Sequence, residues 1–93
     1  MKCLEIIELR TAESNRKILD IHMQKLIDDV VKEMSRDSIK AYFRVMLATD
    51  YSIHLFHDSV EGDKNGSKLG LHLVSTLKEF GLVNHSVWTE LNS

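Results

Sequence analysis

AYFRVMLATDYSIHLFH, residues 41–57, contains two β-strand patterns separated by a short polar break. Alternate side chains of a strand point to opposite faces, so each pattern divides into two sets. The sets in 41–48 are Phe43, Val45 and Leu47 on one face, and Tyr42, Arg44 and Met46 on the other. The sets in 51–57 are Ile53 and Leu55, and His54 and Phe56. The short connection Thr49-Asp50 predicts that the two strands form an antiparallel hairpin.

One strand and one helix are predicted on each side of this hairpin. Before it, 3–10 predicts a strand that is apolar on most of both faces, and a helix follows from an N-cap at Ser14 to 35–37. Its apolar stripe contains Leu19, Met23, Leu26, Ile27, Val30 and Met34. After the hairpin, 58–66 predicts an exposed loop and Ser67 the N-cap of a second helix, which Gly81 terminates. Residues 86–91 predict the last strand.

The order β-α-β-β-α-β is that of the ferredoxin-like α+β fold, a four-stranded antiparallel sheet with two helices on one face. Right-handed crossovers favour the strand order 4-1-3-2. The 93 residues show no linker, internal repeat or proline, so we expect one domain over 1–93.

Composition excludes several classes of protein. Hydrophobic residues make up 43% and charged residues 28% of the chain, so intrinsic disorder is not expected. No apolar run approaches the roughly 18 residues of a membrane span. The net charge of −2 disfavours a strong sequence-independent grip on nucleic acid. The single cysteine, Cys3, excludes an internal disulfide, and with no secretory pattern it fits the cytoplasm.

The second face of the predicted sheet carries too much apolar surface to meet water. Two helices cover only one face of four strands, yet Tyr42, Met46, Phe56 and Trp88 alternate with the helix-facing set. The simplest remedy is a homodimer in which two such faces pack against each other. Arg44, His54 and Glu90, with Glu5 or Glu8, are expected to share that face, so the dimer should enclose a ligand cavity instead of a dry core.

The layout, the two-sided strands and the terminal Val87-Trp88-Thr89-Glu90 strand resemble the dimeric α/β-barrel superfamily, and most closely its antibiotic-biosynthesis-monooxygenase-like branch. The resemblance covers nearly the whole chain and rests on pattern, with no short diagnostic motif. It implies a sheet-to-sheet dimer. It also implies a range of activities, from cofactor-free monooxygenases through haem-degrading enzymes and isomerases to proteins without known activity, so it does not define this chain's function.

The candidate site residues come from the expected cavity. Arg44 and Glu90 form the polar pair to test, and the arginine is suited to hold a carboxylate or enolate. His54 is a candidate acid or base. Tyr42, Phe56 and Trp88 are candidates for binding an aromatic ligand, although packing at a dimer interface explains the same residues. No cofactor is expected in this scheme.

Histidine and loop motifs point less specifically to chemistry. Haem-degrading members of the superfamily use an asparagine on the first strand, a tryptophan on a central strand and a histidine on the second helix. Only His72 matches, so His72 is a further candidate ligand-binding residue, although a histidine at a helix edge explains it equally. His54 and His57 should point to opposite faces of a strand, so no metal site is expected there. The loop 62–68 departs from the phosphate-loop spacing and fits a solvated turn, although Ser67 starts a helix whose free amides can receive an anion.

Two functions therefore stay open. One is a dimeric barrel that binds a small apolar or aromatic ligand, with or without monooxygenase-like catalysis. The alternative is a non-catalytic effector-sensing or protein-interaction module. RNA binding through the sheet lacks the basic and aromatic signature of RNA-recognition modules.

Overall fold

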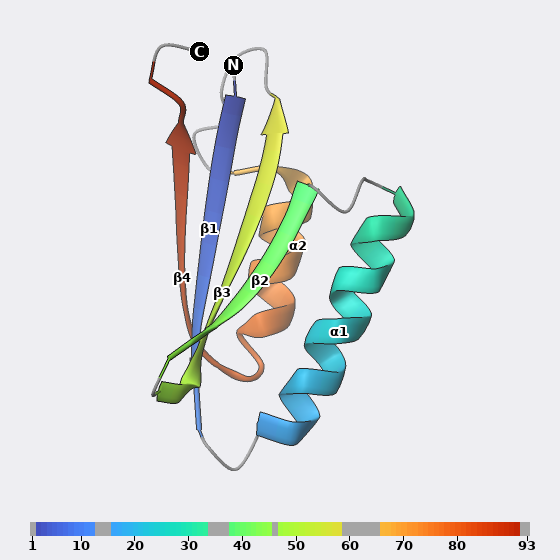
Figure 1. Ribbon diagram of the computed structural model, residues 1–93, viewed down its shortest axis with the longest axis vertical. Coiled ribbons are helices and arrows are strands. Elements are labelled where there is room, and N and C mark those ends of the chain that lie inside the picture. The colour runs from blue at the N-terminus through green and yellow to red at the C-terminus, as the bar shows by residue number, and fades with distance from the viewer. Residues whose placement is uncertain (1, 13–15, 34–37, 46, 59–65, 92–93) are drawn as a thin grey trace.

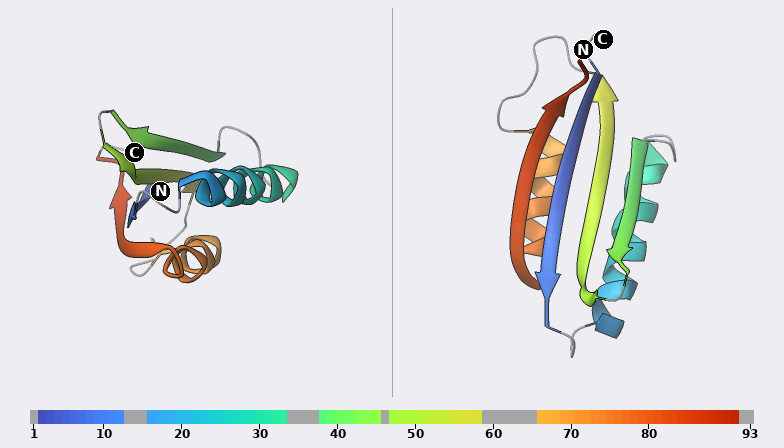
Figure 2. Two further views of the ribbon diagram at one scale, coloured as in Figure 1. Left: turned by 90° about the horizontal axis from the view of Figure 1, so that it is seen from below. Right: turned by 60° about the vertical axis from the view of Figure 1, so that its left-hand side comes forward.

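The computed structural model describes residues 2–12, 16–33, 38–45, 47–58 and 66–91. Six elements follow one another: β1 (Lys2–Thr11), α1 (Arg16–Glu33), β2 (Ile39–Arg44), β3 (Leu47–Asp58), α2 (Lys68–Leu77) and β4 (Gly81–Thr89). The strands form one antiparallel sheet in the order β2-β3-β1-β4, and both helices lie against the same side of it (Figures 1 and 2). The ferredoxin-like topology and the order 4-1-3-2 are confirmed.

The core lies between the helices and the sheet. Every second residue of β1 is buried there: Cys3, Glu5, Ile7, Leu9 and Thr11. The central strand β3 adds Tyr51, Ile53 and Leu55, and the helices bury Leu19, Met23, Val30, Leu73 and Leu77. The core therefore contains the strand residues that the alternation predicted. It also contains the residues of the predicted apolar stripe of the first helix up to Val30. Ser14, Met34 and Met46 lie outside the described residues.

The hairpin turn lies earlier than predicted. β2 ends at Arg44 and β3 begins at Leu47, with an irregular register between Phe43 and Arg44, so Thr49 and Asp50 belong to the strand. Asp50 pairs with Arg10 of β1, and both Arg10 and Arg44 contact its carboxylate at 3.4 Å. The prediction of a turn at Thr49-Asp50 was wrong because pairing with the long first strand extends β3 through these polar residues.

The second helix begins as predicted and ends earlier. Ser67 is the N-cap, and its hydroxyl accepts a hydrogen bond from the Gly70 amide at 3.0 Å. The helix ends at Leu77 with Lys78 as a right-handed C-cap, so Gly81 does not terminate it. Gly81 instead opens β4 opposite Thr11, where an added Cβ would lie 2.0 Å from the Arg10 carbonyl oxygen. The last strand thus starts five residues before the predicted 86–91, and Leu91 lies beyond it.

A separate finding concerns membranes. Among the helices of the described segments, none combines the length and the apolar character that a membrane crossing requires.

Shortening a core side chain of α2 should destabilise the chain. Leu73 is 1% exposed, whereas Leu71 on the same helix is 48% exposed. We expect Leu73→Ala to lower the free energy of unfolding by about 2–5 kcal/mol, because it removes buried methyl groups and leaves a cavity. Leu71→Ala, the matched control, should change it little. Urea denaturation monitored by circular dichroism measures both, and equal losses would contradict the packing described.

Candidate functional site

The side of the sheet opposite the helices is called here the open sheet face. Its side chains come from the second alternation set of each strand and include Leu4, Ile6, Glu8, Arg10, Tyr42, Ser52, His54, Phe56, Leu82, Asn84, Ser86 and Trp88. Large apolar side chains are exposed on it, among them Tyr42 (49%), Phe56 (40%), Trp88 (57%) and Leu82 (77%). The predicted ligand residues Tyr42, Phe56 and Trp88 therefore share one surface with His54.

Aromatic rings follow one another along this face. The Tyr42 and His54 ring centroids are 5.0 Å apart, and those of His54 and Phe56 are 6.4 Å apart. The Nε2 atom of His54 lies 3.0 Å from the hydroxyl of Ser52, so this imidazole is held by a neighbour on its own strand. Phe56 and Trp88 flank Leu4 from the two adjacent strands.

The row ends in an apolar depression of about 350 Å³. Its lining includes Leu4, Phe56 and Trp88, together with Lys2 and Glu90. This volume is at the lower end of the roughly 300–1,000 Å³ typical of small-molecule pockets. The Trp88 indole N–H donates to the Ser86 hydroxyl at 2.9 Å.

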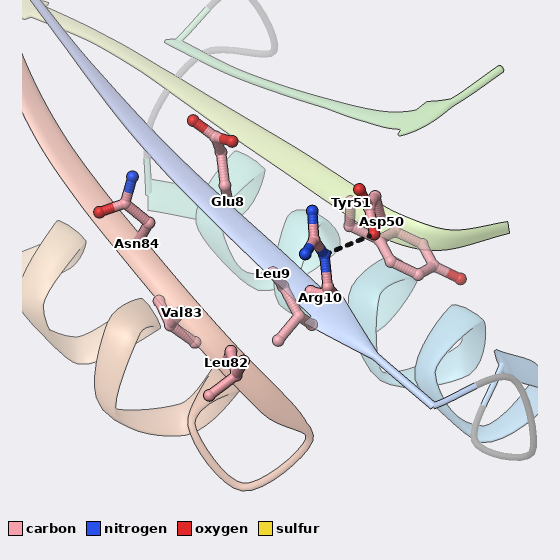
Figure 3. A pocket seen from close by; sticks show the side chains of 8 residues that line it. All are labelled: Glu8, Leu9, Arg10, Asp50, Tyr51, Leu82, Val83 and Asn84. Atoms are coloured by element: carbon pink, nitrogen blue, oxygen red, sulfur yellow. Dashed lines mark ion pairs between the residues drawn. The ribbon is translucent and has the colours of Figure 1, made fainter. Parts of the chain in front are cut away.

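A second depression, of about 290 Å³, lies toward the other end of the open sheet face (Figure 3). Glu8, Arg10, Asp50 and Asn84 give it a polar lining beside Leu82. Burial alone would raise the pKa of Asp50, but hydrogen bonds from Thr49, Arg44 and Arg10, with the charge of Arg10, hold that pKa below its usual value. The open sheet face is thus apolar at one end and charged at the other.

The pair Arg44 and Glu90 is not brought together within the chain. Arg44 ends β2 at one edge of the sheet, and Glu90 follows β4 at the opposite edge. Sequence reasoning missed Asp50, the carboxylate that Arg44 contacts, because it was assigned to a turn. His72 is also separate: it lies exposed on α2, in the helical layer on the other side of the sheet.

Among the residues that the structure describes, the polar group with the most hydrogen bonds lies on the helix side. Glu5 is fully buried, and its carboxylate accepts hydrogen bonds from His57 Nε2 at 2.8 Å and His85 Nε2 at 2.9 Å. It also accepts from the Ser67 backbone N–H at 3.0 Å and the Ser67 hydroxyl at 2.5 Å. We call Glu5, His57, His85 and Ser67 the Glu5 cluster. It joins β1, β3, β4 and the start of α2.

The hydrogen bonds keep Glu5 ionised despite its burial. Burial alone would raise the pKa of this carboxyl, but the donors of Ser67, His85 and His57 outweigh that effect and lower the pKa below its usual value. The sequence placed Glu5 or Glu8 on the apolar second face, and only Glu8 lies there. The available signal was the alternation of Cys3, Glu5 and Ile7, which assigns Glu5 to the core set.

The separation of the two neighbouring histidines is as predicted: His54 lies on the open sheet face and His57 on the helix side. Among the described residues, no group of three or more histidine, cysteine or acidic side chains has the geometry of a metal site.

The fold defines the class of this protein as ferredoxin-like α+β, with an uncovered sheet face. No protein-family model and no curated protein sequence matches the chain. A similar solved structure is that of Rv0793 from Mycobacterium tuberculosis, with a TM-score of 0.63 and 14% sequence identity. The alignment covers 100% of this chain and 98% of that one. At this identity the likeness shows the shared fold alone.

The Glu5 carboxylate should make stability depend on acid pH. Its pKa is lower in the folded chain than in the unfolded chain, so its contribution is complete above the unfolded-state pKa and is lost as the pH falls through the folded-state pKa. Glu5→Gln should remove this dependence and cost about 3 kcal/mol at neutral pH, because buried donors lose a charged acceptor. Urea denaturation over the acidic range measures both effects. The exposed Glu79→Gln is the control, and a Glu5→Gln chain as stable as wild type would refute the assignment.

Proposed function

We propose that this chain is a homodimer that holds a small apolar or aromatic ligand between the open sheet faces of two copies. The observation that carries the proposal is the set of exposed rings on that face, Tyr42, Phe56 and Trp88. A sheet face of this kind is normally covered, because exposed contiguous apolar surface favours association. A second copy is the simplest cover, since a two-fold axis brings identical patches together.

The ligand part of the proposal rests on the mixed chemistry of the same face. Charged and polar groups such as Glu8, Arg10 and His54 lie among the apolar side chains, so two paired faces would enclose polar space. The apolar depression beside Phe56 and Trp88 suits an aromatic ring. The resemblance to the antibiotic-biosynthesis-monooxygenase-like branch extends the proposed ligand binding to cofactor-free oxygenation of that ligand. The catalytic candidates are then Arg44, His54 and Glu90, and the proposed location is the cytoplasm.

The alternative is a non-catalytic effector-sensing or protein-interaction module. The same exposed rings favour it, because another protein would cover the face equally well. Solution mass separates the two functions, since only the first requires a second copy of this chain.

Size-exclusion chromatography with light scattering over a dilution series should give a species near twice 10.7 kDa. Phe56→Glu should shift it to the monomer, because an unpaired charge would be buried in the interface. Ile21→Glu is the matched control: Ile21 is 70% exposed on α1, away from the open sheet face, and its change should leave the dimer intact. A wild-type monomer at every concentration would overturn the dimer and favour the interaction module.

Ligand binding has a built-in reporter, because Trp88 is the only tryptophan and lines the depression. We expect naphthol, a small aromatic probe, to quench its fluorescence saturably. Phe56→Ala should weaken binding about tenfold, the effect of losing about 1.4 kcal/mol of ring contact. Leu71→Ala, which changes a residue of the helical layer, should leave the binding affinity unchanged. Quenching that never saturates, or that is unchanged in Phe56→Ala, would contradict a site at this depression.

A further inference from the structure

Two arginines share one carboxylate at the charged end of the open sheet face. Asp50 lies on β3, which runs between β1 and β2, so each neighbouring strand contributes one arginine. Nε of Arg10 lies 3.4 Å from Oδ1 of Asp50, and Nη1 of Arg44 lies 3.4 Å from Oδ2. Each oxygen of the carboxylate therefore faces a different guanidinium group, and Asp50 neutralises only one of the two positive charges.

The shared carboxylate leaves most of the hydrogen-bonding capacity of the arginines unused. Two guanidinium groups offer about ten N–H donors, whereas one carboxylate has about four acceptor positions. Both contacts are also longer than the about 2.7–2.9 Å of a strong charge-assisted hydrogen bond. The side chains of Arg10 and Arg44 are 69% and 60% exposed, whereas that of Asp50 is 17% exposed. The arginines therefore present donors to the solvent side of the face.

Two depressions adjoin these arginines. Arg10 lines the depression of about 290 Å³ described above (Figure 3), and Arg44 lines a neighbouring one of about 360 Å³. Glu8 and Asp50 line both of them, so the two depressions meet at the ion pairs. Their volumes are close to or within the range of about 300–1,000 Å³ that small-molecule pockets have.

The larger depression has aromatic walls. Tyr42 and Phe43 line it next to Arg44, and both rings are exposed. A bound ring that packs against an aromatic side chain buries a large apolar area. A planar carboxylate matches the fork of a guanidinium group. The depression therefore combines the two features that recognise an aromatic acid.

Glu8 limits the charge that this site accepts. It lies two residues before Arg10 on β1, opposite Ser52 of β3. With Glu8 included, the charges of the two arginines and the two carboxylates sum to zero. One carboxylate of a ligand leaves a single net negative charge, and a second anionic group would add to the repulsion between like charges. The site therefore favours a monoanion.

We propose that Arg10 and Arg44 bind a small aromatic monocarboxylate, with its carboxylate on the two guanidinium groups and its ring against Tyr42. Asp50 positions both arginines, and Glu8 selects against anions of higher charge. This site is at the other end of the open sheet face from the apolar depression, so it is a second ligand position. The proposed pairing of two faces would exclude water from it, but binding does not require that cover.

Isothermal titration calorimetry with benzoate tests the site. Wild type should bind benzoate saturably, and it should bind the neutral analogue benzamide at least about tenfold more weakly, because the charge-assisted hydrogen bonds are lost. Arg10→Gln and Arg44→Gln should each weaken benzoate binding about tenfold for the same reason. Lys17→Gln, which removes an exposed cation of α1, is the matched control. Equal affinities for benzoate and benzamide, or an equal loss in Lys17→Gln, would overturn the proposal.

Isophthalate and inorganic phosphate test the selectivity. Isophthalate is benzoate with a second carboxylate, so wild type should bind it more weakly than benzoate. Glu8→Gln should raise the affinity for isophthalate more than the affinity for benzoate, and the control Glu79→Gln, on an exposed residue beyond α2, should change neither. An unchanged ratio in Glu8→Gln would overturn the role of Glu8. Phosphate that competes as well as benzoate would overturn the aromatic class of ligand.

A measurement on the unaltered chain locates the ligand. In ¹H–¹⁵N spectra, benzoate should shift the Nε–H signals of Arg10 and Arg44 and leave the Trp88 indole signal in place. A shift of Trp88 alone would place benzoate in the apolar depression and overturn this site. The two ligand positions fail separately, because Phe56→Ala should leave benzoate binding unchanged and Arg44→Gln should leave naphthol quenching unchanged.

Discussion

The buried carboxylate of Glu5 is the interaction on which the arrangement of this fold depends most directly. A charge without solvent is costly unless hydrogen bonds replace its water, and here four donors do so. Those donors belong to β3, β4 and α2, which are far apart in the sequence and meet only in the folded chain. The cluster therefore couples the position of the second helix to the register of the three-strand core of the sheet.

The sheet separates two kinds of chemistry. On the helix side, burial is nearly complete and the polar groups satisfy one another. On the open sheet face, rings such as Phe56 and Trp88 are exposed beside charged residues, and the surface remains uncovered in the single chain. The proposed association concerns the second side, whereas the first side carries the buried Glu5 cluster.

Local pattern predicted the elements well and their ends less well. The alternation in 51–57 and the N-cap at Ser67 correctly located β3 and the start of α2. The turn at Thr49-Asp50 and the stop at Gly81 were wrong for a common reason: both assignments relied on residue preference, and strand pairing overrode it. Asp50 is held in a strand by Arg10 across the sheet, and Gly81 is required by the close approach of the neighbouring backbone.

By itself the sequence determined the order of elements, the two-sided alternation of the strands and the excess of apolar residues on the second face. These follow from periodicities of two and 3.6 residues, which are properties of neighbouring positions. Only the tertiary structure decided that Arg44 meets Asp50 and not Glu90, and that Glu5 meets His57, Ser67 and His85. The physical reason is that hydrogen-bond partners across a sheet depend on strand order, register and helix placement. No local spacing encodes the distance between side chains 52, 62 and 80 positions apart.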